Sequence, residues 1–247
     1  MMNYLLVGGF SLLIGSFLNV LVFRLLQRES IIVPRSYCPL CGQTLKAADL
    51  IPLLSYILLG GRCRYCKGKI KIQYPLVESL TMLLSMLIYS KWGLSFHFIE
   101  GCIFTALLIT ASFTDLNEGI IPDRLTYPGI ISGCLLACFS AGIGNAILGA
   151  AVFGGFFLII ASVFQGGMGG GDIKLAALIG VYTGLQGAIM VFILSSLLAG
   201  LWVLPLCLQG QASRKTKIKL GPFLAIAAWV VWMYGNEMML AYLRWLA

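Results

Sequence analysis

YLLVGGFSLLIGSFLNVLVF, residues 4–23, is the stretch of sequence that decides the fold. These 20 residues contain no charged side chain. As a helix rising about 1.5 Å per residue, they are long enough to cross the hydrocarbon core of a bilayer once. A secretory signal is a poorer description, because no basic segment precedes the run and no small-x-small cleavage site separates it from Arg24. We therefore predict a first transmembrane helix over residues 1–23.

The composition extends this prediction to the whole chain. Of the 247 residues, 60% are hydrophobic and only 11% are charged, whereas soluble domains are about 25% charged. We predict an all-α, polytopic integral membrane protein surrounded by membrane lipid, and we exclude a soluble enzyme, a disordered protein and a nucleic-acid partner. The run over residues 173–183 is short enough to be re-entrant. About eight transmembrane helices are expected, over residues 4–23, 76–89, 96–113, 125–141, 146–164, 173–183, 188–208 and 220–234.

The positive charges predict the orientation in the membrane. Nine of the 17 Lys and Arg residues lie between Arg24 and Lys71. If every run crosses once, 15 of the 17 fall on the side of this loop, and cytoplasmic loops are the ones enriched in Lys and Arg. We expect a multi-pass protein of the cytoplasmic membrane with both termini outside. The segments expected to be cytoplasmic are 24–74, 114–124, 165–174 and 209–219, the last with Arg214, Lys215, Lys217 and Lys219.

Two CxxC pairs stand in the long polar loop, with 21 residues between them. Each pair can place two thiolates on one metal ion, and four thiolates complete a tetrahedral Zn²⁺ site. Such a site leaves no position for a catalytic water, so the zinc is expected to be structural. A redox role fits less well, and Gly42 and Gly68 suit the tight turns after the pairs. We predict that residues 24–74 form a small zinc-binding domain held together by Cys38, Cys41, Cys63 and Cys66.

A few acidic residues at the ends of apolar runs are the candidates for catalysis. Asp115 ends the third run and Asp172 starts the sixth, and the predicted topology puts both at the same membrane face. Helix N-capping is the alternative for Asp123 and Asp172. It does not suit Asp115, which lies at the unfavourable end of a helix dipole. Glu78, one turn into the second run, faces the helix bundle, a substrate or its own helix N-terminus.

Two carboxyl groups held close together cannot both ionise easily. One keeps its proton and acts as an acid, while the other activates water, as in aspartic proteases. We expect Asp172, at a helix N-terminus, to be the ionised member and Asp115 to hold the proton, within a pair that titrates as a unit. Three glycines, Gly169 to Gly171, are expected to allow positive φ and a close approach of a peptide main chain.

Taken in order along the chain, these segments resemble the type IV prepilin leader peptidases, a family of bifunctional aspartic peptidases and N-methyltransferases. The resemblance covers nearly the whole sequence. It lies in Gly15-Ser16-Phe17-Leu18-Asn19-Val20, the two CxxC pairs around Asp49-Leu50-Ile51-Pro52, Tyr74-Pro75-Leu76-Val77-Glu78, Thr114-Asp115 with Ile121-Pro122-Asp123, Gly169-Gly170-Gly171-Asp172-Ile173-Lys174, and Gly221-Pro222-Phe223.

The resemblance implies that Asp115 and Asp172 are the catalytic pair of a domain spanning residues 75–247. It also implies a bacterial enzyme whose substrates are type IV prepilin or pseudopilin precursors with a short basic leader. The new N-terminus would then be methylated from S-adenosylmethionine, although the sequence has no strand–GxGxxG–helix unit for this donor. We expect the substrate to be bound or supported by Gly169, Gly171, Lys174, Asp123 and Glu78.

Two other functions use the same features differently. A transporter or proton channel would use the carboxylates as a relay, with inverted repeats and a site at the membrane midplane. The sequence shows no internal repeat, and its acidic residues gather at one face. A non-catalytic, zinc-anchored assembly protein would need the cysteines but not the aspartates, so mutating the two groups separately discriminates it.

Overall fold

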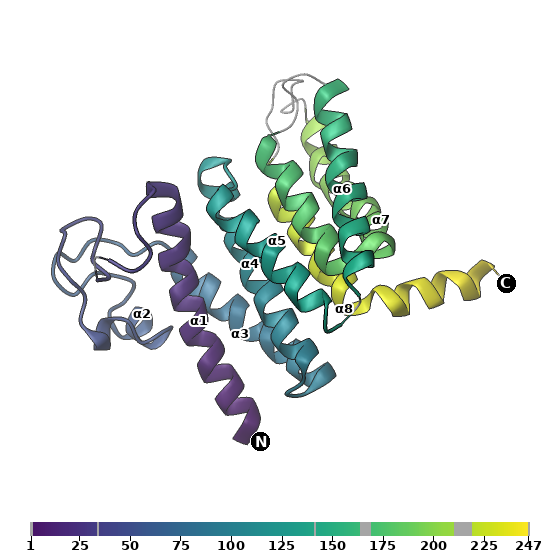
Figure 1. Ribbon diagram of the computed structural model, residues 1–247. Helices are drawn as coiled ribbons and strands as arrows, with labels where there is room; N and C mark the ends of the chain where they lie inside the picture. Colours follow the sequence, from purple (N-terminus) through teal and green to yellow (C-terminus); the bar gives the residue numbers. More distant parts are fainter. Residues whose placement is uncertain (1, 34, 141, 164–168, 210–218, 247) are drawn as a thin grey trace. The chain divides into compact units, whose positions relative to one another are not determined.

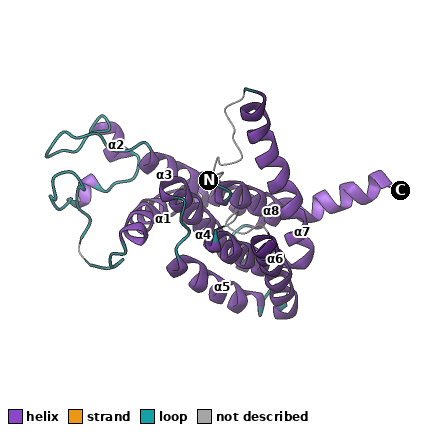
Figure 2. Cartoon of the chain, turned by 90° about the horizontal axis from the view of Figure 1, so that it is seen from above, coloured by secondary structure: helices purple, strands orange, loops and turns teal. Residues whose placement is uncertain are grey.

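The computed structural model describes residues 2–33, 35–140, 142–163, 169–209 and 219–246. Helices account for all the regular elements of these residues, and none of them forms a strand (Figure 2). Two isolated bridges pair Tyr37 with Thr44 and Arg62 with Lys69 in the polar loop. The all-α prediction is confirmed for the described chain. Arg214, Lys215 and Lys217 of the expected 209–219 loop lie outside it.

The chain divides into two compact units, Met1–Thr110 and Ala111–Ala247, with the boundary inside one long helix. The expected domains instead divide at the ends of the polar loop, residues 24 and 74. Figure 1 labels the helices α1 (Met2–Gln27), α2 (Leu54–Leu58), α3 (Gln73–Trp92), α4 (Phe96–Glu118), α5 (Asp123–Ala137), α6 (Ile143–Val163), α7 (Gly170–Leu208) and α8 (Gly221–Leu246), and a short 3₁₀ helix, η1, covers Ala47–Asp49.

Five of the described helices, α1, α4, α6, α7 and α8, are long and apolar enough to cross a membrane. The protein is therefore a multi-pass membrane protein. Each of the eight expected runs overlaps a helix, although α5 ends at Ala137, before the end of the 125–141 run. Two of the runs, 173–183 and 188–208, share α7. This helix is kinked at Gly184, whose φ of 65° and ψ of −177° interrupt the helical geometry. Eight separate crossings remain a prediction.

In the first unit, α1 and α3 pack against each other in antiparallel directions. The Asn19 Nδ2 atom donates a hydrogen bond to the Tyr74 carbonyl at 3.0 Å. Four residues earlier in α1, Gly15 lies against Glu78 so closely that a Cβ there would be 2.7 Å from the Glu78 Cα. The glycine thus allows the close approach that sets the register of the two helices. Val77 lies in this contact region and is fully buried.

In the second unit, α7 packs against α5, α6 and α8. A side chain at Gly149 of α6 or at Gly180 of α7 would overlap the backbone of the other helix, so the two glycines permit this contact. Beside the kink, the Asn145 Oδ1 atom accepts a hydrogen bond from the Leu185 N–H at 3.2 Å. These contacts fix the first half of α7, which carries Asp172.

Candidate active site and metal centre

Asp115 lies in the last turn of α4, and its carboxylate points to the start of another helix. α4 ends at Glu118 and is followed by Gly119, whose φ of 68° suits a C-terminal glycine. The Gly119 N–H donates to the Asp115 carbonyl at 2.7 Å. The Asp115 carboxylate accepts the N–H of Gly221, the first residue of α8, at 3.0 Å. Asp115 therefore sits at the favourable end of α8, which corrects the expectation drawn from its own helix alone.

Gly221 contacts Asp115 in a way that depends on its lack of a side chain. A Cβ at this position would be 2.7 Å from the Asp115 Oδ2 atom and 3.1 Å from its Cγ. Nearby, the Lys219 Nζ atom donates to the Leu116 carbonyl at 2.6 Å, and its positive charge acts on Asp115. Sequence reasoning gave neither residue a role at the site. In the sequence, the only indication of these contacts is the segment Gly221-Pro222-Phe223.

Asp172 lies in the first turn of α7 and is brought close to Asp115. The N-cap is Gly169, so Asp172 is the third helical residue and not the N-cap itself, although a carboxylate at this position can cap the helix from within its first turn. The backbone of Gly169 hydrogen-bonds the carboxylate of Asp172, and the charge of Asp115 acts on the same group. Two carboxylates that lie far apart in the sequence thus interact within the second unit. Asp115 is 5% exposed, and Asp172 is half-buried.

The glycines before Asp172 allow another segment of the chain to approach closely, and their backbone conformation is ordinary. None of the three has a positive φ, so that part of the expectation is wrong. A Cβ at Gly171 would be 3.0 Å from the Ile121 Cβ and 3.2 Å from the Ile121 carbonyl oxygen. A Cβ at Gly170 would meet nothing within 4 Å. Gly171 therefore lets the segment before α5 lie against the start of α7.

Asp123 and Lys174 pair with each other at the surface of the second unit. The Lys174 Nζ atom lies 2.5 Å from the Asp123 Oδ1 atom and 5.2 Å from the centre of the Tyr127 ring. The N-cap of α5 is Pro122, so Asp123 is the first helical residue and not a cap. The pair links the start of α5 to the first turn of α7, which carries Asp172.

Glu78 belongs to the first unit, where it holds the polar loop. Its side chain is buried against α1, and Ser16 of that helix hydrogen-bonds the carboxylate. The Leu53 N–H donates to the Glu78 Oε2 atom at 2.8 Å. The observed contacts of this carboxylate are therefore with α1 and with the loop that carries the cysteines.

The four cysteines of that loop form one cluster. Their Sγ atoms all lie within 4.8 Å of one another, and those of Cys38 and Cys66 are 3.9 Å apart. A tetrahedral ion with metal–sulfur bonds of about 2.3 Å needs sulfurs roughly 3.8 Å apart. Backbone N–H groups of Cys66 and Tyr65 lower the pKa of Cys63 to about 7, so the cluster favours at least one thiolate near neutral pH. These residues fit a four-thiolate metal site.

The two CxxC turns share one backbone pattern. In the first, the Gly42 N–H donates to the Cys38 carbonyl at 2.8 Å, and in the second the Lys67 N–H donates to the Cys63 carbonyl at 3.0 Å. Both donors have positive φ, 70° at Gly42 and 60° at Lys67. The expectation is confirmed for Gly42 but is wrong for Gly68. Gly68 is instead tightly packed, because a Cβ there would overlap the side chain of Leu40.

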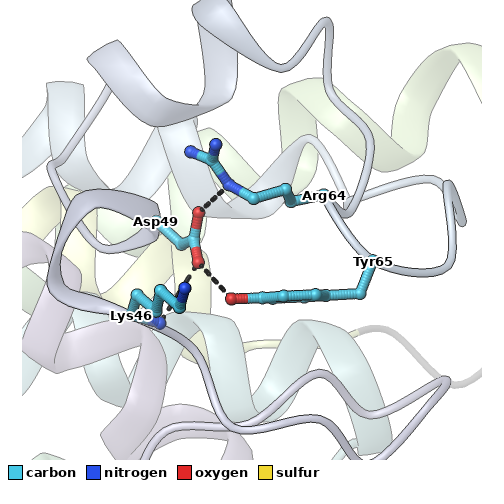
Figure 3. Close-up of polar contacts among 4 residues, drawn as sticks. All are labelled: Lys46, Asp49, Arg64 and Tyr65. Atoms are coloured by element: carbon cyan, nitrogen blue, oxygen red, sulfur yellow. Dashed lines mark hydrogen bonds and ion pairs between the residues drawn. The ribbon is translucent and has the colours of Figure 1, made fainter.

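Asp49 ties the two halves of the cysteine loop together (Figure 3). Its carboxylate accepts hydrogen bonds from the Arg64 Nε atom at 2.6 Å, the Tyr65 hydroxyl at 3.2 Å and the Lys46 N–H at 3.1 Å. Burial raises the pKa of Asp49, but these hydrogen bonds outweigh that effect and hold it below its usual value. Arg64 and Tyr65 are the middle residues of the second CxxC pair, so Asp49 orients that pair.

Fold and site together define a multi-pass membrane protein with an interacting pair of aspartates and a cluster of four cysteines that could hold a metal ion. Residues 10–92 match the bacterial peptidase A24 N-terminal domain, and residues 102–204 match the type IV leader peptidase family. The chain belongs to this family and is an enzyme of it, a peptidase.

The family assignment also rests on relatives of nearly the same length. A prepilin leader peptidase/N-methyltransferase of Aeromonas salmonicida is 35% identical, over 96% of this chain and 93% of its own. Proteins of the same name from Bacillus subtilis and Pseudomonas aeruginosa are 32% and 35% identical. The matches cover 95% and 94% of this chain, and 96% and 91% of those proteins. No solved structure shows significant similarity.

Proposed function

We propose that the protein is a membrane aspartic endopeptidase that removes the basic leader from type IV prepilin-like precursors. The observation that carries this proposal is that the segment following Asp115 packs through Ile121 against Gly171, next to Asp172, so that the charge of Asp115 acts on Asp172. The names of its relatives supply the substrate class. Because positive charge predicts the cytoplasmic side, we place cleavage at the cytoplasmic face, with eight crossings and both termini outside.

In the proposed mechanism the pair shares one proton. The ionised carboxylate removes a proton from a water molecule, whose oxygen attacks the scissile carbonyl carbon. The protonated carboxyl donates its hydrogen bond to the carbonyl oxygen, which takes up the electron pair. The tetrahedral intermediate then collapses, the C–N bond breaks, and the leaving nitrogen takes a proton from the pair. One water is consumed, and the pair again holds a single proton.

The Gly171 contact supports a role for the start of α7 in placing Asp172. Because Ile121 packs directly against Gly171, a movement of the segment before α5 would be passed to the first turn of α7. The Asp123–Lys174 ion pair joins the same two segments. We propose that these residues hold Asp172 in position next to Asp115, and that the exposed part of this region receives the extended precursor.

We further propose that the cysteine cluster binds structural Zn²⁺ through Cys38, Cys41, Cys63 and Cys66. Four thiolates close the coordination sphere, so the ion would hold the loop together without taking part in peptide hydrolysis. The N-methyltransferase activity that the relatives carry in their name requires a methyl donor, which we take to be S-adenosylmethionine. The freed amine would displace the donor sulfur from the methyl carbon and then lose a proton.

The test is cleavage of a prepilin-like precursor by the purified protein in vesicles. We expect Asp115→Asn and Asp172→Asn each to abolish cleavage while the protein remains folded and inserted. Glu237→Gln, which removes an exposed carboxylate from α8 of the same unit, is the matched control and should cleave normally. Normal cleavage by either aspartate variant would remove the pair from the mechanism, and aspartate-dependent proton flux without cleavage would favour transport.

A further inference from the structure

The short helix α2 of the cysteine loop exposes an apolar face. Leu54, Ile57 and Leu58 are 56%, 70% and 81% exposed. Their i, i+3, i+4 spacing puts all three on one side of the helix. In water such a face would be unfavourable, because burying each of these side chains is strongly favourable. Some apolar surface therefore has to cover it.

The hydrogen bond to Glu78 fixes the level of α2 along α1. Leu53 directly precedes α2, and its N–H is bound by Glu78, which packs against Gly15. Gly15 lies near the middle of α1, a candidate membrane span of 26 residues. The start of α2 therefore lies beside the middle of α1, well before the end of that helix.

The strongly exposed apolar side chains of α1 extend to this level. Large apolar side chains of α1 are exposed as far as Phe17, which is 51% exposed. The large apolar side chains from Leu18 to the end of α1 are buried or half-buried. The strongly exposed apolar surface of α1 thus extends to the level where Gly15 meets Glu78, so the apolar face of α2 lies level with the end of that surface.

The backbone before α2 is constrained in a way that directs the helix. Leu53 has a φ of 60° and a ψ of −50°, and the Leu54 N–H donates to the Pro52 carbonyl at 2.6 Å. This three-residue γ-turn is rare and strained for a residue with a side chain. The bond from Leu53 to Glu78 holds the turn, so α2 leaves the loop in a fixed direction.

We infer that α2 is an interfacial helix that inserts its apolar face into the cytoplasmic leaflet of the membrane and anchors the cysteine loop there. The partner is the bilayer itself, reached at the depth that Glu78 sets. The charge of the loop fits this partner, because residues 24–74 hold nine Lys and Arg residues and two acidic ones. Basic segments next to apolar side chains bind the anionic surface of the cytoplasmic leaflet.

The test uses the photocrosslinking amino acid p-benzoylphenylalanine in the full chain, reconstituted into vesicles of phosphatidylethanolamine and phosphatidylglycerol. It replaces Ile57 in one variant, and Leu58 in a second in case the first does not fold. The control is Gln43, an exposed polar residue of the same loop beside the first CxxC turn, whose carbonyl accepts the Cys38 N–H.

After irradiation, mass spectrometry should find phospholipid adducts on the α2 peptide and none at Gln43. Precursor cleavage by the same samples reports folding separately. A crosslink from α2 to residues 111–247 or to a second copy of the chain would show that protein covers this face. That result would overturn the inference, and so would the absence of lipid adducts at Ile57 and Leu58 in variants that still cleave the precursor.

Discussion

The contact between Gly221 and Asp115 predicts a large effect from one added methyl group. In Gly221→Ala, the new Cβ would stand 2.7 Å from the Asp115 Oδ2 atom and 3.1 Å from its Cβ and Cγ atoms. The carboxylate must then move away from the Gly221 N–H, which it now accepts at 3.0 Å. The predicted consequence is a displaced Asp115 in a protein that still folds.

The expected loss follows from the lost hydrogen bond. A hydrogen bond to a charged group contributes about 1.5–3 kcal/mol, which corresponds to roughly a 10- to 150-fold fall in rate. The loss should appear in kcat more than in KM, because the displaced group acts on the reacting bond. Stability should fall by no more than the same amount, and alanine at the first position of α8 offsets up to about 1 kcal/mol of that loss, because it is a better helix residue than glycine.

Gly144→Ala is the matched control. Gly144 is the second residue of α6 in the same unit and is exposed. An added Cβ at Gly144 meets nothing within 4 Å. Cleavage of a prepilin-like precursor should therefore continue at the wild-type rate in Gly144→Ala. Equal activity of the two variants, or a Gly221→Ala enzyme as fast as the wild type, would refute the reasoning.

Three further predictions concern the first unit. Asp49→Asn should lower the melting temperature of the metal-free, reduced protein at neutral pH. Because the pKa of Asp49 is held below its usual value, the difference in melting temperature from the wild type should stay constant down to about pH 4.5 and close below about pH 4. A difference that persists unchanged at pH 3 contradicts this. Lys67→Gly should stabilise the loop by about 1 kcal/mol and Gly42→Ala should destabilise it by a similar amount, because both positions need a positive φ. Urea unfolding measures both changes in the free energy of unfolding. Changes of the same sign in the two variants would contradict the need for a positive φ at both positions. Glu78→Ala should free the strained Leu53 and speed proteolysis of the loop, and adding Leu53→Gly to the same chain should slow proteolysis again. Equal rates of loop proteolysis in Glu78→Ala and the wild type would show that the carboxylate does not hold the turn.

The parts of the fold that follow from local pattern could be predicted from the sequence. Apolar runs of helical length gave the helices, and the CxxC spacing gave a cluster whose sulfurs lie within 4.8 Å. The helices depend on residues close together in the chain, and the cluster depends on two such pairs that one metal ion can join. The kink at Gly184 was not expected as such, because the sequence shows only a break between two apolar runs, and a break does not tell a kink from a loop.

The contacts that could not be predicted join distant segments through backbone atoms. Asp115 and Asp172 could be paired from their residue type and a common membrane face, but nothing marks Gly221 N–H as the donor to Asp115. The bond between Leu53 and Glu78 is of the same kind, since any residue except proline offers an N–H group. The ion-pair partner of Asp49 could not be predicted for a different reason, because the loop contains several basic side chains and the sequence does not distinguish among them.

The surroundings of the two aspartates bear on how they divide the work. The expectation that Asp172 is the ionised member rested on its position at a helix N-terminus. Asp115 also lies at one, through the N–H of Gly221 at the start of α8. Each carboxylate therefore receives a helix N-terminus, which favours negative charge, and the pair carries one such charge when it shares a proton. In the proposed mechanism, either member can then be the base in one step and the acid in the next, because the proton must pass from water to the leaving nitrogen. A pair of this kind has no spare member, so replacing either aspartate by asparagine removes both roles at once.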